Sequence, residues 1–173
     1  MANHKMKIFS KTKRKYGEKY NDHFFEQYKI YIEMADRISA RRMLANTFFL
    51  TLNSALITVL SVTSREYFGK TIFPFIMAVI LCCVWKKIIS SYSQLNSGKF
   101  KVIHEIEKHL PLALFEAEWR SLGEGVDKNK YIPLTRVEHW VPNCFILLYI
   151  SIYFINNLDL ISFIKKVIVC VVI

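Results

Sequence analysis

Two long apolar runs joined by a short charged segment constrain this chain more than any other feature. Met43 to Ser64 is a run of 22 residues without a formal charge, long enough for a helix to cross a bilayer at about 1.5 Å per residue. Arg65 to Lys70 turns the chain, and Thr71 to Trp85 adds 15 uncharged residues. Lys86 and Lys87 can extend their ammonium groups to the headgroup layer beside Trp85. The two runs predict a transmembrane helical hairpin.

A third uncharged run follows later in the chain. Trp140 to Leu158 is 19 residues long, begins with an interfacial tryptophan and carries Pro142 where a helix tolerates it. We expect this run to be a third span. The apolar tail that follows contains Lys165 and Lys166, each of which would cost about 3 kcal/mol at a bilayer centre. We therefore expect residues 159–173 to lie on the outer face.

The positive charge is concentrated beside the apolar runs. The chain has a net charge of +10, with 11 of its 24 Lys and Arg residues in residues 1–42 and nine in residues 86–139. This distribution follows the positive-inside rule, so both segments are expected in the cytoplasm. Contact with anionic membrane lipid accounts for the excess charge more simply than a nucleic acid does. We expect no nucleic-acid partner.

The two basic segments contain helical patterns. Apolar residues between Phe24 and Ile38 recur every three or four positions and predict a helix that continues into the first span, behind a mobile basic tail over residues 1–20. A similar pattern runs from Ile88 to His109, and residues 112–122 suggest a further short helix. We expect these helices to pack into a small cytoplasmic layer. The residues expected to pack within this layer or between copies of an oligomer are Tyr28, Tyr31, Ile38, Tyr92, Leu95, Val102, Ile103, Ile106 and Trp119.

The first span carries a stripe of hydroxyl residues. Thr47, Thr51, Ser54, Thr58 and Ser61 fall within an arc of about 80° on a helical wheel. Such a stripe serves either as the wetted lining of a pore or as a close-packing helix surface, which is its commoner use. Asn46 and Asn53 share another direction, where an amide can bridge two helices. We include Asn53 with the five hydroxyl residues as a candidate pore-lining or packing residue.

The histidines do not form a recognisable catalytic or metal site. His104 and His109 are five positions apart and so fall on different helix faces, and neither they nor His139 belong to an HExxH motif, a cysteine pair or a glycine-rich phosphate loop. We expect no catalytic residue, no metal and no cofactor.

Three blocks of sequence resemble a known family. They are residues 31–42 with 46–53, residues 93–107, and residues 118–125 with 133–139. They resemble the RipA family of small octameric bacterial membrane proteins over about residues 25–155. The layout is also similar to the two-span SLATT effector modules of anti-phage operons. The first resemblance implies a homo-octamer in a bacterial inner membrane, and the second implies a pore-like effector that injures its own cell's membrane.

Together these patterns predict an all-α integral membrane protein in five segments. The segments are a cytoplasmic tail and helix (1–42), the hairpin (43–85), a cytoplasmic helical segment (86–139), the third span (140–158) and the outer tail (159–173). The expected function is a regulated pore or membrane-disrupting effector, with itself, lipid and a cytoplasmic protein trigger as partners. The alternative is a non-conducting scaffold that recruits a cytoplasmic protein.

Overall fold

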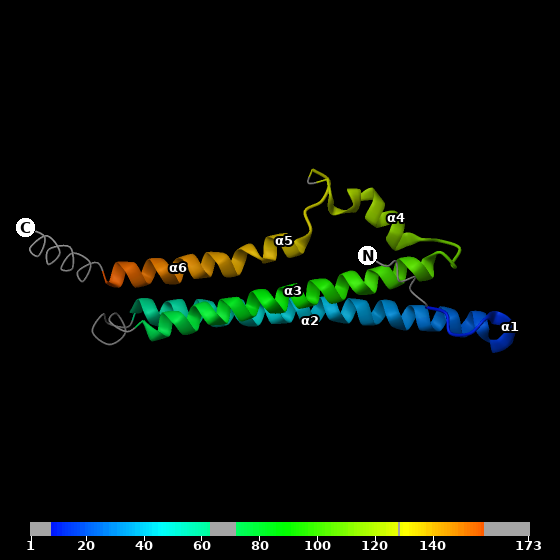
Figure 1. Cartoon of the computed structure of the whole chain (residues 1–173), viewed down its shortest axis with the longest axis horizontal. Helices are drawn as coiled ribbons and strands as arrows, with labels where there is room; N and C mark the ends of the chain where they lie inside the picture. The colour runs from blue at the N-terminus through cyan, green and yellow to red at the C-terminus, as the bar shows by residue number, and fades with distance from the viewer. Residues whose placement is uncertain (1–7, 63–71, 128, 158–173) are drawn as a thin grey trace, which may run out of the picture. The chain divides into compact units, whose positions relative to one another are not determined.

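The computed structural model describes residues 8–62, 72–127 and 129–157 of the 173-residue chain, and within these ranges every regular element is a helix. The predicted all-α fold is therefore confirmed. The predicted turn at 65–70 and the outer tail at 159–173 lie outside the described residues. In chain order the elements are α1 (Lys13–Tyr16), α2 (Tyr20–Val62), α3 (Phe73–Glu107), α4 (Leu114–Ser121), the 3₁₀ turn η1 (Gly123–Gly125), α5 (Leu134–Glu138) and α6 (Trp140–Asn156) (Figure 1).

The helix α2 is one uninterrupted element of 43 residues, as its sequence predicts. No glycine or proline occurs between Tyr20 and Val62. Surface ion pairs one turn apart, such as Lys29–Glu26 at 2.9 Å, add a few tenths of a kcal/mol each to its polar half. Gly17, with φ of 98°, ends α1 and allows the chain to reverse before α2 begins.

Among the described residues, three helical segments are long and apolar enough to cross a membrane: Tyr20–Val62, Phe73–Glu107 and Leu134–Ile155. They correspond to the three predicted spans. Pro74 lies in the first turn of α3, where a missing N–H removes no helical hydrogen bond. The helix then runs for 35 residues and ends four positions before Pro111.

The chain divides into two compact units. The head unit comprises residues 1–43 and 91–133, and the span unit comprises residues 44–90 and 134–173. Because α2 and α3 are continuous, each helix contributes one stretch to each unit.

The span unit is a three-helix bundle of α2, α3 and α6 with two adjoining apolar clusters. Leu60, Phe75, Ala78, Cys82 and Tyr149 form one cluster. Phe49, Trp85 and Ile89 form the other, in which the Phe49 and Trp85 rings stack with their centroids 5.8 Å apart. Phe145 on α6 packs against both clusters, so the third span joins the hairpin along its length.

The head unit pairs the first half of α2 with the second half of α3. Ala35 and Ile103 are buried, and the ammonium group of Lys99 lies 4.5 Å from the ring centroid of Tyr31. The ring of Phe9 packs against Phe24, with centroids 6.1 Å apart. Residues 8–20 therefore differ from the expected mobile tail, because aromatic contacts hold them to the helices.

Candidate functional site

The five hydroxyl residues of the stripe all lie on the exposed surface of the span unit. They are Thr47, Thr51, Ser54, Thr58 and Ser61. Packing against α3 or α6 of the same chain would bury them, so that form of the packing interpretation does not fit. What covers this surface in a membrane is lipid, water or a second copy of the chain.

The other two spans expose much less polar surface at membrane depth. Between Phe73 and Val84 of α3, the exposed side chains are phenylalanine, isoleucine, methionine, cysteine and valine. On described α6, the exposed hydroxyl is that of Ser151, which donates to the carbonyl of Leu147 at 2.9 Å. Exposed polar side chains of the described spans are therefore concentrated on α2.

The hydroxyl stripe lies between apolar residues on the exposed face of α2. Leu44, Phe48, Val59 and Val62 form an apolar flank on one side of the stripe and are more than half exposed, and Leu50 on its other side is 45% exposed. At 100° per residue the four residues of the apolar flank occupy the arc that follows the stripe. A helix with adjoining polar and apolar exposed flanks meets two different surroundings.

The hydroxyl of one threonine in the stripe is hydrogen-bonded within its own helix. Thr58 donates to the carbonyl oxygen of Ser54 at 3.0 Å, which is the usual bond of a hydroxyl to the preceding helical turn. Its oxygen keeps lone pairs that can accept a hydrogen bond from water or from another chain.

The opposite side of α2 carries a buried amide that joins all three spans. Asn53 has 0% of its surface exposed, and its amide nitrogen donates to the carbonyl of Phe49 at 2.8 Å. Its side-chain oxygen accepts from the Cys82 thiol at 3.2 Å and the Tyr149 hydroxyl at 2.9 Å. Asn53 therefore makes contacts of the packing kind and does not belong with the exposed stripe.

Asn46 forms a second junction one heptad before Asn53. Its oxygen accepts from the indole N–H of Trp85 at 2.9 Å, and its amide nitrogen donates to the carboxylate of Glu138 at 2.8 Å. Close by in the sequence, Lys86 donates to the side-chain oxygen of Asn143 at 2.9 Å. In the sequence, the seven-residue spacing of Asn46 and Asn53 indicated that they share one face of α2. No sequence pattern indicated that Glu138 and Asn143 would take part in these contacts.

A buried carboxylate organises the head unit. Glu107, the last residue of α3, is 1% exposed and accepts from the hydroxyl of Tyr28 at 3.2 Å. It also accepts the backbone N–H groups of Phe115 at 2.9 Å and Glu116 at 3.0 Å. These amides lie in the first turn of α4 and have no partner inside that helix, so Glu107 caps α4 from the preceding helix. Burial, with a smaller effect from the Glu107 charge, raises the pKa of Tyr28 to about 12.

The expected packing residues of the head unit differ in how much of their surface is exposed. Ile103 is 1% exposed, while Leu95 is 50% exposed and Trp119 is also exposed. The others are half-buried: Tyr28, Tyr31, Ile38, Tyr92, Val102 and Ile106. The inner face of α3 runs through Tyr92, Lys99, Ile103 and Glu107, and Leu95 lies outside this face, exposed in the single chain.

Trp119 packs against the turn that follows its own helix and not in the interior of the head unit. A Cβ atom built on Gly125, which has φ of 69°, would lie 3.0 Å from the Trp119 ring atom Cη2. The ring thus closes the turn that follows α4, and a larger residue at Gly125 would displace it.

Two of the described histidines have ordinary structural contacts, whereas the buried Nε2 atom of His104 has no hydrogen-bond partner among the described residues. His109 meets the ring of Phe9 edge-on at 4.6 Å, and the Nε2 atom of His139 lies 3.5 Å from the Ser90 hydroxyl. Among the residues that the structure describes, no three His, Cys, Asp or Glu side chains are grouped to hold a metal ion.

These features define a helical membrane protein with three spans in the part of the chain that the structure describes. The model of the octameric membrane protein family (8xMP) matches residues 25–158, and the chain belongs to this family. The match confirms the resemblance to the RipA-like octameric proteins and identifies the chain as a homo-oligomeric membrane protein. No curated protein and no solved structure matches the chain.

Proposed function

We propose that the chain forms a ring-shaped homo-octamer in a bacterial inner membrane, in which the hydroxyl stripes of α2 surround a regulated pore. The observation that carries this proposal is the concentration of exposed polar side chains on one flank of one span. Polar groups in membrane proteins face other protein or water in preference to lipid tails. A flank shared by identical chains around an axis satisfies that preference in every copy at once.

The dimensions of such a ring suit conduction. Eight helices, each about 10 Å wide, form a ring roughly 25 Å across at the helix centres and leave a lumen on the order of 15 Å. Hydroxyl groups keep a lumen of this kind wet, whereas leucine side chains favour dewetting.

The orientation follows from the charge distribution. Residues 1–42 and 86–139 carry 20 of the 24 Lys and Arg residues, so we place the N-terminus and the head unit in the cytoplasm. There the head unit is available to a cytoplasmic protein that triggers opening. The layout shared with SLATT modules suggests that the opened pore injures the cell during phage infection, which phage plating with and without expression of the chain would test.

The test replaces two residues of the stripe in the full-length protein. Thr51→Leu with Thr58→Leu makes the proposed lumen apolar, and we expect dye leakage from liposomes containing the variant to fall to background while the octamer persists on native gels. The matched control is Phe48→Leu with Val59→Ile on the apolar flank, which should leak like the parent. Parental leakage from the double leucine variant would refute the pore.

The same variant separates the pore from its main rival. If the stripe packs one chain on the next, two bulky leucines prevent close approach and the octamer itself should dissociate. That result, together with liposomes that stay intact under every trigger, would favour a membrane-anchored scaffold that recruits a cytoplasmic protein.

A further inference from the structure

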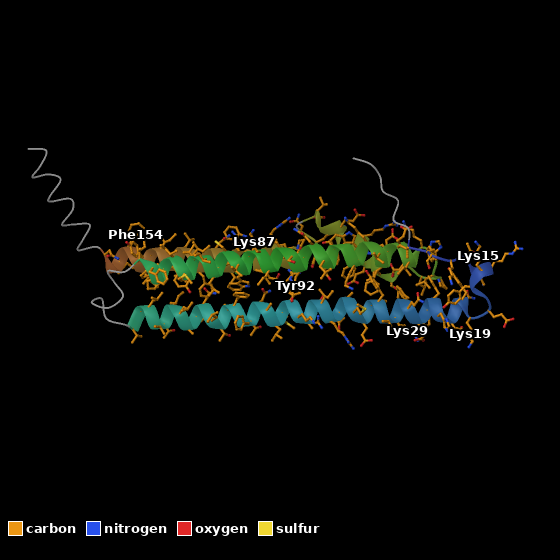
Figure 2. The ribbon with its side chains drawn as sticks, turned by 60° about the horizontal axis from the view of Figure 1, so that its bottom comes forward. Lys15, Lys19, Lys29, Lys87, Tyr92 and Phe154 are labelled. Atoms are coloured by element: carbon orange, nitrogen blue, oxygen red, sulfur yellow. The ribbon has the colours of Figure 1, made fainter. Side chains whose placement is uncertain are left out.

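A basic patch lies at the start of the head unit. It consists of Lys11, Lys13, Arg14, Lys15 and Lys19, all of them exposed, of which Figure 2 labels Lys15 and Lys19. The Tyr16 hydroxyl and the Nδ1 atom of His23 lie 2.8 Å apart and join α1 to α2, which holds the patch in place. In the part of the chain that the structure describes, none of the five cations forms an ion pair.

The cations of this patch outnumber the acidic residues beside them. Residues 11–22 hold the five cations together with Glu18 and Asp22, which leaves a net charge of +3. Asp22 already places an anion in the first turn of α2, where the helix end favours one, whereas three consecutive cations, Lys13, Arg14 and Lys15, lie in α1. An anionic partner would relieve the repulsion among these cations.

Membrane lipid at the entry point of α2 is too distant to be that partner. From Lys19 to Arg42, the last charge before the first span, α2 rises about 35 Å. Charges are largely screened beyond about 8–10 Å at physiological salt.

The head unit also carries an acidic patch. It consists of Glu116, Glu118, Glu124 and Asp127 in α4 and the segment after it, and because Arg120 lies among them and pairs with Glu116, residues 116–127 carry a net charge of −3. Glu118 and Glu124 are exposed and form no ion pair among the described residues. Glu107 fixes the start of α4, and α4 lies on the side of α3 away from α2 (Figure 1).

We infer that the basic patch of one copy docks on the acidic patch of the next copy in the octamer. A closed ring of more than two identical chains needs a head-to-tail contact, in which two different surfaces of the same chain meet. The two patches are complementary in charge, lie on one unit and are not paired with each other in the described chain. This contact concerns assembly and does not depend on whether the ring conducts.

The test reverses each patch in a separate full-length chain. One chain carries Lys11→Glu, Lys13→Glu and Lys15→Glu, which changes the net charge of residues 11–22 from +3 to −3, and the other carries Glu118→Lys with Glu124→Lys, which changes the net charge of residues 116–127 from −3 to +1. In either chain alone the two patches then repel, and we expect the octamer fraction at low salt to fall about tenfold or more, because like charges across an interface are strongly unfavourable. When the two chains are co-expressed, each reversed patch meets its complement, so a mixed octamer with four copies of each chain should form.

Native mass spectrometry of the purified complexes reports both results. Gln94→Glu with Lys101→Glu, at exposed positions of α3, is the control for a general change in charge and should assemble like the parent. Lys11, Lys13 and Lys15 lie well outside the roughly 15–20 residues next to a span that set topology, so membrane insertion is preserved. Octamers from either reversed chain alone, or a failure of co-expression to restore them, would overturn the contact.

Discussion

The hydroxyl of Tyr149 donates a hydrogen bond to the side-chain oxygen of Asn53, which lies 2.9 Å away and 96 positions earlier in the chain. The Cys82 thiol donates to the same oxygen, so a single amide on α2 contacts both α3 and α6. In a bilayer, apolar surface alone does not hold helices together, because the lipid tails are equally apolar. Such a polar junction fixes which faces of the three spans meet.

Tyr149→Phe removes the hydroxyl and keeps the ring. We expect it to lower the free energy of unfolding of the span unit by about 0.6–2 kcal/mol, the range measured for hydrogen bonds between membrane helices. Tyr153→Phe, one turn later on α6, is the matched control, because the Tyr153 ring packs edge-on against Phe75 and its hydroxyl makes no described hydrogen bond. Denaturation of both variants in mixed micelles measures the difference, and equal loss would show that the hydrogen bond contributes nothing.

Ile103→Asp introduces a charge into the inner face of the head unit. Because Ile103 is 1% exposed, an unpaired carboxylate there should cost several kcal/mol and abolish the assembled protein. Leu95→Asp, at a position that is half exposed, should be tolerated. Native gels compare the two, and an unchanged octamer for Ile103→Asp would contradict the packing of α2 on α3.

Tyr28 makes the stability of the head unit depend on pH in the alkaline range. Burial and Glu107 raise its pKa from 10.0 to about 12, so the folded chain holds the phenolic proton more tightly than the unfolded chain. The contribution is fully present below about pH 10 and is lost as the pH rises to about 12. Thermal denaturation at intervals from pH 8 to 12 should show a steeper loss for the parent than for Tyr28→Phe, and identical slopes would rule out the linkage.

The proposed orientation has a direct check. A reporter that is active only outside the cytoplasm should be silent when fused after Arg42 or Lys128 and active when fused after Asn157. The reason is that the two basic segments stay on the cytoplasmic side while the third span crosses. Activity after Lys128 would reverse the assignment.

The sequence alone determined the spans and the helical class. The length of an uncharged run and its hydropathy decide whether a segment enters a bilayer, and both are local properties. The absence of glycine and proline from Tyr20 to Val62 likewise made α2 a single helix before any partner was known.

The tertiary structure decided which side chains face inward. Lys99 interrupts an apolar pattern in the sequence, yet it is buried over Tyr31, while Leu95 is half exposed. Glu107 is buried because it meets Tyr28 from α2 and the first amides of α4, and these partners come together only when the chain folds. A polar group can be buried when its partners are present, and the sequence does not show which distant residues those partners are.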